Sequence, residues 1–478
     1  MSSITGFGKK MTKARAIVTL LIFTCVTLVP EGAFPMSLSQ ENALGQKVVK
    51  LIRKSMPLIE NGEILTYVNE VGQRIVQQVG VTPYKFRFYV INESVPNSFA
   101  VPGGNIFIYR GIIDMMSRED ELAAVLGHEC GHITARHFQR SMDESKLTSI
   151  EMLAGIIAGA LLQAPGLVAG GMAAGQTSML KDSREHEMEA DLRGFGYLCK
   201  AGYDPEAMPQ MMHALLNHTW LETSNVPNYL ETHPGTEQRV LYLDNLVKKV
   251  EAKHKYVRKL PPVGNFKVIQ AAMIGGYGSE AKALERFRAG IRKGDSTAVY
   301  GLGCLYLREQ KWRRAVAELK EAARLMPCDT FVLSTLALAC RKTGKLQEAK
   351  SILESALAIN PSSPIAQSPI AQYRLAQVLM AMGKPNEAIE NLTQIKESAL
   401  TFPNIYYELG VALGRTGKLG LAHFYLGCYY YNQDDTAAAI SQFKMAKPLI
   451  VDSPSKLRKI NDYLKVLTPK KRGFSLHL

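Results

Sequence analysis

The sequence predicts a mostly helical α+β protein, in which a domain with a small β-sheet is followed by an all-helical array of repeats. In the first half, segments with apolar residues at helical spacing surround a short segment, residues 86–109, that is rich in β-branched and aromatic residues. In the second half the pattern repeats every 34 residues, which is the tetratricopeptide (TPR) period. At 478 residues the chain is also too long for a single core.

The first 33 residues have the pattern of a secretory signal peptide. Basic residues within 9–15 precede the apolar run from Ala16 to Val29, which is too short to cross a bilayer as a helix but fits the apolar region of a signal peptide. We expect cleavage near Gly32-Ala33. Because Glu31 fits that cleavage site poorly, an uncleaved anchor is the alternative.

The next segments predict the scaffold of the first domain. Residues 47–78 have helical spacing and should form one or two helices, with Pro57 near the middle. Residues 86–91 read as a β-strand. Residues 98–109 read as two strands joined by a tight turn at Pro102-Gly103-Gly104.

A helix that begins just after Ser117 is predicted for the stretch around Glu121 to His137. Ser117 is expected to cap it, acidic residues occupy its first turn, and apolar residues follow at helical spacing. These apolar residues are Leu122, Val125, Leu126 and Cys130.

This helix carries the pattern H-E-x-x-H at residues 128–132. Residues four apart lie about 40° from each other around a helix, so His128 and His132 can direct ring nitrogens at one metal ion. Glu129 lies about 100° from His128, which suits a general base acting on a metal-bound water. A catalytic zinc usually takes a third protein ligand.

Residues 183–194 offer that third ligand. If they are helical, Glu187 and Asp191 share a face, and the small Ala190 beside them lets this helix approach the first one closely. Glu189 points to another side. The residues alone leave Glu185 and Glu189 open as alternatives to Glu187.

Between the two motifs, residues 153–179 contain Gly, Ala and Leu and no charged residue. The length would suit a transmembrane span. Pro165-Gly166 and Gly170-Gly171 interrupt it, so we expect a pair of short apolar helices near the site. Contact with a membrane surface is the alternative.

The repeats begin near residue 260. Ala315 and Ala349 are 34 positions apart, and the same register places Ala281 in an earlier unit. Five extra residues, seen as a duplicated S-P-I-A-Q at 363–372, precede Ala388, and Ala422 follows 34 residues later. About four units and a half-repeat near 439–443 are expected. The predicted division is a first domain at 37–259, a repeat domain at 260–469 and a basic tail at 470–478.

Together, H-E-x-x-H and the later S-R-x-x-E-x-x-A-D resemble the gluzincin metallopeptidases of the CAAX-prenyl-protease and HtpX type, which include BepA-like periplasmic proteases with C-terminal TPR repeats. The resemblance implies a zincin-type metalloprotease domain with one zinc ion per chain. It implies His128, His132 and Glu187 as ligands, Glu129 as the catalytic base, and Asp191 as the residue that supports the ligands.

Two further segments resemble the same family. His233-Pro234, followed by Arg239, implies either a hydrogen-bond donor to the reaction intermediate or a fourth zinc ligand in a latent form; a histidine held by a helix start is the simpler alternative. The other histidines are expected to be surface or packing residues. The segment N-S-F-A-x-P-G-G-x-I implies an edge strand that pairs with an extended peptide, and an ordinary core hairpin is its alternative. Its candidate substrate-binding residues are Phe99, Ala100, Val101, Gly103 and Gly104.

Composition restricts the partners. The formal net charge is +14, but no nucleic-acid motif occurs, so we expect attraction to anionic surfaces or acidic polypeptides rather than nucleic acid. The seven cysteines form no C-x-x-C motif, and their pairing is left open.

Two hypotheses follow. The first is a zinc endopeptidase of the periplasm, which is reached through the signal peptide, with peripheral membrane contact through 153–179 as an option. Its repeats would bind misfolded or misassembled envelope proteins, such as outer-membrane β-barrel proteins or their assembly machinery. The second is a chaperone-like scaffold protein whose protease site is normally latent.

Overall fold

The computed structural model describes residues 36–143, 184–222, 229, 233–234, 236–253, 261–359, 369–400, 402 and 404–468. The predicted signal peptide, the apolar segment 153–179 and the basic tail lie outside these residues. Among the helices within them, none combines the length and the apolar character needed to cross a membrane.

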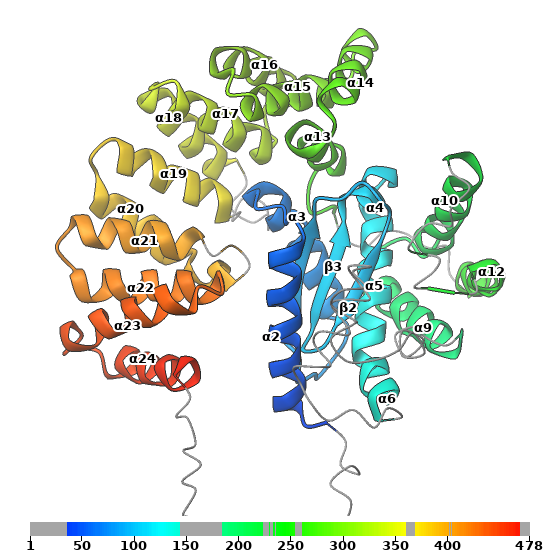
Figure 1. The fold of residues 1–478 in the computed structure, drawn as a ribbon. Coiled ribbons are helices and arrows are strands. Elements are labelled where there is room, and N and C mark those ends of the chain that lie inside the picture. Colours follow the sequence, from blue (N-terminus) through cyan, green and yellow to red (C-terminus); the bar gives the residue numbers. More distant parts are fainter. Residues whose placement is uncertain are drawn as a thin grey trace, which may run out of the picture.

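The N-terminal part of the chain builds a small β-sheet surrounded by helices (Figure 1). Its strands are β1 (Arg87–Ile91), β2 (Ser98–Val101) and β3 (Asn105–Tyr109). Its helices are α2 (Leu38–Ser55), α3 (Gly62–Val76), α4 (Arg110–Met115), α5 (Glu119–Thr134), α6 (His137–Asp143), α9 (Arg184–Lys200), α10 (Ala207–Glu222) and α12 (Thr236–Lys253). The predicted mostly helical α+β architecture is confirmed.

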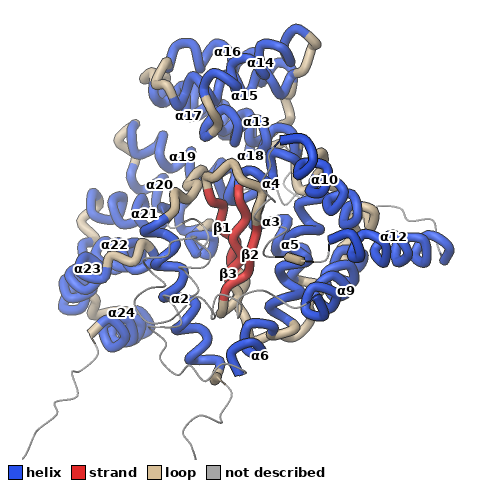
Figure 2. The backbone as a smooth tube through the Cα atoms, turned by 45° about the vertical axis from the view of Figure 1, so that its right-hand side comes forward, coloured by secondary structure: helices blue, strands red, loops and turns tan. Residues whose placement is uncertain are grey.

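The sheet has the strand order β1-β3-β2, so β2 is an edge strand (Figure 2). β1 runs parallel to β3, and β2 runs antiparallel to it with Ser98 opposite Ile108. The turn between β2 and β3 has positive φ angles of 79° at Gly103 and 84° at Gly104, which favour glycine. The strands predicted at 86–91 and 98–109 are present.

Residues 47–78 fold as two helices, as predicted. The side chain of Asn61 accepts a hydrogen bond from the Ile64 amide (3.0 Å) and thereby caps α3. The segment between α2 and α3 is extended and lies along the outer edge of β1, where the Ile59 amide donates to the Val90 carbonyl (2.8 Å). Pro57 separates the two helices because proline has no backbone N–H with which to continue the hydrogen bonds of α2.

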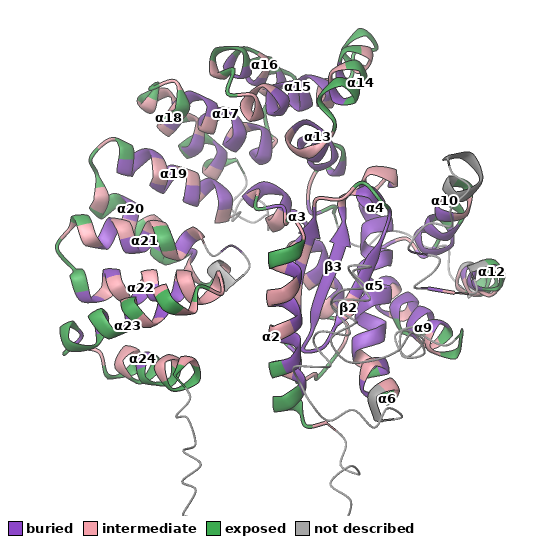
Figure 3. Cartoon of the chain, viewed as in Figure 1, coloured by how far each residue is buried: buried purple, intermediate pink, exposed green. Residues whose placement is uncertain are grey.

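Helix α5 is buried along its whole length, with β2 and β3 on one side and α9 and α10 on the other (Figure 3). The residues that predicted it, Leu122, Val125, Leu126 and Cys130, are all in the core. Burial on every side explains why the apolar stripe of this helix is interrupted by polar residues, since those polar side chains contact partners on neighbouring elements.

The expected cap of α5 is wrong. Ser117 lies one position too early, and its amide and hydroxyl both donate to the Glu121 carboxylate (2.6 Å each). The residue at the cap position is Arg118, whose side chain makes no capping hydrogen bond. The acidic first turn instead ties neighbouring elements together, because Glu119 accepts hydrogen bonds from the Tyr67 hydroxyl (2.7 Å) and the Val263 amide (2.8 Å).

Helices α5 and α9 approach each other through small residues. A Cβ atom on Gly131 would lie 2.4 Å from the Ala190 carbonyl oxygen, and one on Gly194 would lie 2.8 Å from the Gly127 carbonyl carbon. No larger side chain fits at these points. The close approach predicted from Ala190 is therefore present.

The C-terminal part is an array of antiparallel helices that curves around the N-terminal part (Figure 1). Its helices are α13 (Phe266–Tyr277), α14 (Glu280–Arg292), α15 (Ser296–Arg308), α16 (Trp312–Leu325), α17 (Thr330–Lys342), α18 (Leu346–Ala358), α19 (Pro369–Ala381), α20 (Pro385–Gln394), α21 (Asn404–Arg415), α22 (Leu419–Asn432), α23 (Thr436–Leu449) and α24 (Pro454–Leu467), with a short 3-10 helix, η2 (Lys396–Leu400).

The predicted 34-residue register holds from α16 onwards. Ala315, Ala349, Ala388 and Ala422 are all buried at helix–helix contacts. The extension backwards is wrong, because Ala281 is exposed and the buried alanine of α14 is Ala283. Helices α14 and α16 begin 32 residues apart (280 and 312), whereas α16 and α18 begin 34 apart (312 and 346), so counting back by 34 misses the buried position by two.

The array is packed against α3. The ring of Tyr67 on α3 lies between Phe266 of α13 (centroids 6.3 Å apart) and Phe331 of α17 (6.2 Å). A bidentate ion pair joins the buried Glu63 to Arg374 of α19 (3.2 Å). The largest hydrophobic cluster therefore runs through both predicted domains, and two smaller clusters lie beside it.

Candidate metal centre

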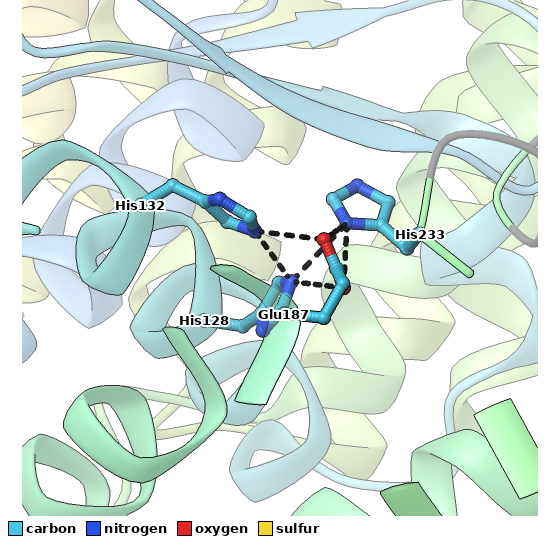
Figure 4. A group of neighbouring side chains, drawn as sticks. All are labelled: His128, His132, Glu187 and His233. Atoms are coloured by element: carbon cyan, nitrogen blue, oxygen red, sulfur yellow. Dashed lines mark hydrogen bonds and ion pairs between the residues drawn. The ribbon is translucent and has the colours of Figure 1, made fainter. Parts of the chain in front are cut away.

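Four side chains from three separate segments converge at one point (Figure 4). They are His128 and His132 of α5, Glu187 of α9, and His233, which lies just before α12. One potential ligand atom from each lies within 4.8 Å of the others, and all four residues are buried. The Nε2 atoms of His128 and His132 are 3.0 Å apart. The Glu187 carboxylate lies 3.3 Å from His132 Nε2 and 3.5 Å from His128 Nε2.

Asp191 fixes the ring of His128. Its Oδ1 lies 2.8 Å from His128 Nδ1, so a proton on Nδ1 leaves the lone pair of Nε2 directed at the other ligand atoms. Asp191 is itself held by Arg239, whose Nε and Nη2 donate to its two oxygens (2.7 and 2.8 Å), and by the Tyr242 hydroxyl. Arg239 also contacts Glu187 (2.6 Å).

These contacts set the protonation states that a metal needs. Burial opposes ionisation of Glu187, but His233, Arg239 and His132 outweigh it and hold the pKa of its carboxyl well below the ordinary range. Burial lowers the pKa of His128, although Asp191 opposes this. An ionised carboxylate and a neutral imidazole are the forms that bind a metal.

His137, which was expected to be a surface or packing residue, is instead buried behind His132. Its Nδ1 lies 2.9 Å from His132 Nδ1, and its Nε2 lies 3.3 Å from Glu189 Oε2. Arg136 has a positive φ of 56°, which ends α5 and turns His137 back towards the site. A histidine five positions after the motif was the available signal, but the sequence could not show the direction of the turn.

Glu129 is fully buried beside the cluster. Its Oε1 accepts a hydrogen bond from the Ser98 hydroxyl of β2 (2.6 Å). Its Oε2 has no hydrogen-bond partner among the described residues. A buried carboxylate oxygen without a partner is costly, and a water beside the metal cluster would satisfy it. No pattern in the sequence marks Ser98 as a residue of the site.

His233 fills the fourth side of the cluster. Its Nδ1 lies 3.1 Å from Glu187 Oε1 and 3.2 Å from His128 Nε2, while its Nε2 lies 3.3 Å from the Ser98 carbonyl. Its ring stacks on Tyr229 (centroids 4.5 Å apart). Burial lowers the pKa of His233, but Glu187 outweighs burial and the pKa is raised.

The residues fit one zinc ion. Zinc takes nitrogen and carboxylate ligands, usually four in all, and three imidazoles and one carboxylate meet here. The close Nε2 atoms of His128 and His132, together with the partnerless Glu129 oxygen, are arranged for a cation and its water rather than for a self-contained hydrogen-bond network. The alternative ligands Glu185 and Glu189 lie outside the cluster, and Glu189 instead pairs with Arg140 and Arg193.

The predicted substrate-binding residues lie on β2 and its turn. Ser98, at the start of β2, borders the cluster, and Ala100 is partly exposed. Phe99 and Val101 are buried in the core beneath α2. Gly103 and Gly104 form the turn at the far end of the strand, where the Gly103 amide donates to Glu41 (3.3 Å). Their predicted part in binding substrate stays a prediction.

The sequence matches known protein families in two regions. Residues 65–247 match peptidase family M48, and residues 300–364 and 341–407 match tetratricopeptide repeats. The M48 match contains all the residues of the cluster.

Individual proteins are also similar to this chain. The β-barrel assembly-enhancing protease of Escherichia coli K12 is 27% identical over 75% of this chain and 74% of its own length. A putative β-barrel assembly-enhancing protease of Vibrio cholerae is 30% identical over 63% of each chain. The mitochondrial metalloendopeptidase OMA1 of Schizosaccharomyces pombe is 28% identical over 42% of this chain and 60% of its own length.

Proposed function

We propose that this chain, a zinc metalloendopeptidase with a peptidase family M48 domain and C-terminal tetratricopeptide repeats, acts in the periplasm on misfolded or misassembled envelope proteins. The observation that carries the proposal is the convergence of three histidines and a glutamate around the buried Glu129. The names of the relatives, which refer to β-barrel assembly, support the class of substrate.

In this proposal His128, His132 and Glu187 hold the zinc ion. Zinc, when bound, polarises the scissile carbonyl and makes a water molecule more acidic. Glu129 accepts a proton from the attacking water at Oε2 and later passes it to the leaving nitrogen. The Ser98 hydroxyl keeps Glu129 in place through Oε1 (2.6 Å). Asp191 and Arg239 orient the ligands.

Substrate is proposed to bind along the outer edge of β2. An edge strand offers unpaired amide and carbonyl groups, which bind an extended peptide without strong sequence preference. The support for this is that the start of β2 reaches the cluster, because Ser98 contacts both Glu129 and His233. A peptide paired with β2 would therefore run past the metal ligands.

The proposal is tested with Glu129→Gln, which keeps the shape of the side chain and removes the base. We expect hydrolysis of casein to fall at least about 100-fold, with the zinc content unchanged. Undiminished hydrolysis in the purified variant would overturn the assignment of Glu129.

The ligand assignment is tested by metal analysis. Glu187→Gln should lose zinc, whereas Glu185→Gln, a change of the same chemistry at an exposed position two residues away, should keep one equivalent. A full zinc equivalent in Glu187→Gln would move the third ligand elsewhere.

One observation favours the second candidate, a chaperone-like scaffold with a latent site. His233 lies where a water or substrate ligand would bind, 3.1 Å from Glu187 Oε1 and 3.2 Å from His128 Nε2. If His233 closes the site, His233→Ala should retain zinc and hydrolyse casein faster than the wild type. If His233 stabilises the reaction intermediate, the same variant should be slower by roughly 100-fold or more. A Glu129→Gln chain that fully replaces the wild type in cells would favour the scaffold.

A further inference from the structure

A groove on the inner side of the array is lined by alternate helices of the repeats. The first of two adjoining cavities, about 330 Å³ in volume, is lined by residues of α13, α15, α17 and α19 together with the start of α3. The second, about 510 Å³, continues from it and shares Trp312 and Lys342 with it. We call this the basic groove; its charged and aromatic residues are Arg308, Trp312, Arg313, Arg314, Lys342 and Arg374.

Several cations of the basic groove lack an acidic partner. Lys342 lies over the Trp312 ring (5.5 Å) and Arg314 lies over the Tyr306 ring (6.0 Å). Within the part of the chain that the structure describes, neither of them, nor the exposed Arg313, forms an ion pair. Lys311, beside them, is paired with Glu309 (2.7 Å). The groove therefore carries a net positive charge that attracts an anion.

One carboxylate already occupies the inner end of the groove. Glu63 of α3 is 1% exposed and accepts hydrogen bonds from Arg374 Nη2 at both oxygens (3.2 Å each). An arginine fork of this kind pairs in a bidentate manner with carboxylate and phosphate groups, and here its partner is a carboxylate. Glu63 thus shows that the lining binds a carboxylate. Arg313, Arg314 and Lys342, the cations without an ion pair among the described residues, extend this lining beyond Trp312.

We propose that the basic groove binds an acidic segment of a partner polypeptide, with carboxylates on Arg313, Arg314 and Lys342 and an aromatic or aliphatic side chain near Trp312. A polypeptide suits the site better than an anionic membrane because the anion that the lining already holds is a carboxylate, that of Glu63, between α3 and the repeats. The same observation favours an acidic polypeptide over a nucleic acid, because the anion held by the lining is a carboxylate rather than a phosphate.

The inference deepens the proposed function, since it rests on the repeats being its protein-binding module, but it does not depend on hydrolysis. The test therefore uses the full-length zinc-loaded chain with Glu129→Gln, which leaves bound peptide uncut. The probe is a fluorescent peptide of about ten residues rich in Asp and Glu, and its dissociation constant is measured by anisotropy at low and high salt.

Two double variants separate the groove from overall charge. Arg313→Glu with Lys342→Glu should raise the dissociation constant at least about tenfold. Lys282→Glu with Arg288→Glu makes the same charge change at exposed positions of α14 outside the groove, and should change it by less than about twofold. Salt should weaken binding by the unaltered groove.

Two other kinds of anionic ligand, lipid vesicles and nucleic acid, are compared with the acidic peptide. Vesicles of phosphatidylglycerol and phosphatidylcholine and a single-stranded oligonucleotide are titrated alongside the peptide. Failure to bind the acidic peptide, equal losses in the two double variants, or tighter groove-dependent binding of vesicle or oligonucleotide would each overturn the proposal. Casein hydrolysis is measured separately, in chains that keep Glu129. A result there bears only on the proposed catalytic function and not on peptide binding by the basic groove.

Discussion

At the scale of single residues, the metal centre depends on a buried ionic network behind its ligands. Asp191 contacts His128, Arg239 and Tyr242, and Arg239 bridges Asp191 to Glu187. Burial raises the pKa of the Asp191 carboxyl, but Arg239 and His128 outweigh it and lower that pKa. Removing one member of such a network leaves its partners charged and unpaired.

We expect Asp191→Asn to lower zinc affinity by about 10- to 100-fold. The amide has the shape of the carboxylate but no charge, so it orients His128 less firmly and leaves Arg239 with one anionic partner. Competition with a chromophoric chelator measures the affinity. Tyr242→Phe, which removes a single hydrogen bond to Asp191, serves as the comparison and should have a smaller effect. An affinity equal to that of the wild type in Asp191→Asn would show that the ligands are oriented without it.

At the scale of elements, the site is assembled where α5 meets α9. Gly131 lies on α5 beside His132, and it faces Ala190 on α9, beside Asp191. Because these two residues are so small, the helices approach closely, and this sets the distance from His128 and His132 to the Glu187 carboxylate. Packing and metal binding are therefore linked through one helix–helix interface.

Gly131→Ala should destabilise the protein by about 1 to 3 kcal/mol and weaken zinc binding, because the new methyl group would lie 2.4 Å from the Ala190 carbonyl oxygen. Gly196→Ala is the matched control on α9, where an added Cβ meets no atom within 4 Å. That change should be neutral or stabilising by up to roughly 1 kcal/mol through helix propensity. Chemical denaturation and metal analysis of both variants check this, and similar losses in the two would argue against the close contact.

The array depends on small residues at helix contacts in the same manner. Ala283 of α14 is 1% exposed and belongs to the core, whereas Ala281 is exposed. The two alanines differ in environment although they lie two positions apart on one helix.

Ala283→Leu should cost about 1 to 3 kcal/mol of unfolding free energy, since the larger side chain has no space in the core. Ala281→Leu should stay within about 0.5 kcal/mol of the wild type. Denaturant titration followed by circular dichroism compares them. The reverse ranking would restore the 34-residue register that the sequence suggested for this helix.

At the scale of the whole molecule, the array and the metallopeptidase domain form one folded body. Tyr67 is buried between Phe266 and Phe331, and an added Cβ on Gly62 would lie 2.4 Å from Ile370. Further along, Arg53 of α2 donates to the Asn432 carbonyl at the end of α22 (2.8 Å). The array is thus anchored to α3 through its earlier helices and to α2 near the turn between α22 and α23.

We expect the zinc-loaded protein to unfold in a single calorimetric transition, because one core runs through both parts. Gly62→Val should lower the temperature of this transition, since the new side chain must displace that of Ile370 on α19. Two separate transitions in the wild type would indicate that the parts are only loosely joined.

The sequence by itself determined the local features. Helical spacing, the H-E-x-x-H motif and the 34-residue period depend on neighbours within a few turns, so they predicted α5, the strands and the repeats. The mostly α architecture and the zinc metallopeptidase with TPR repeats are confirmed. The resemblance to a known family, rather than spacing, selected Glu187 among three glutamates.

Only the tertiary structure decided which distant groups meet. His137 turns back onto His132 because of one positive φ angle at Arg136, and Ser98 reaches Glu129 because β2 lies against α5. The docking of the repeats on α3, with Glu63 seated on Arg374, likewise joins residues 311 positions apart. Such contacts are fixed by the packing of whole elements, and a pattern of nearby residues holds no information about them.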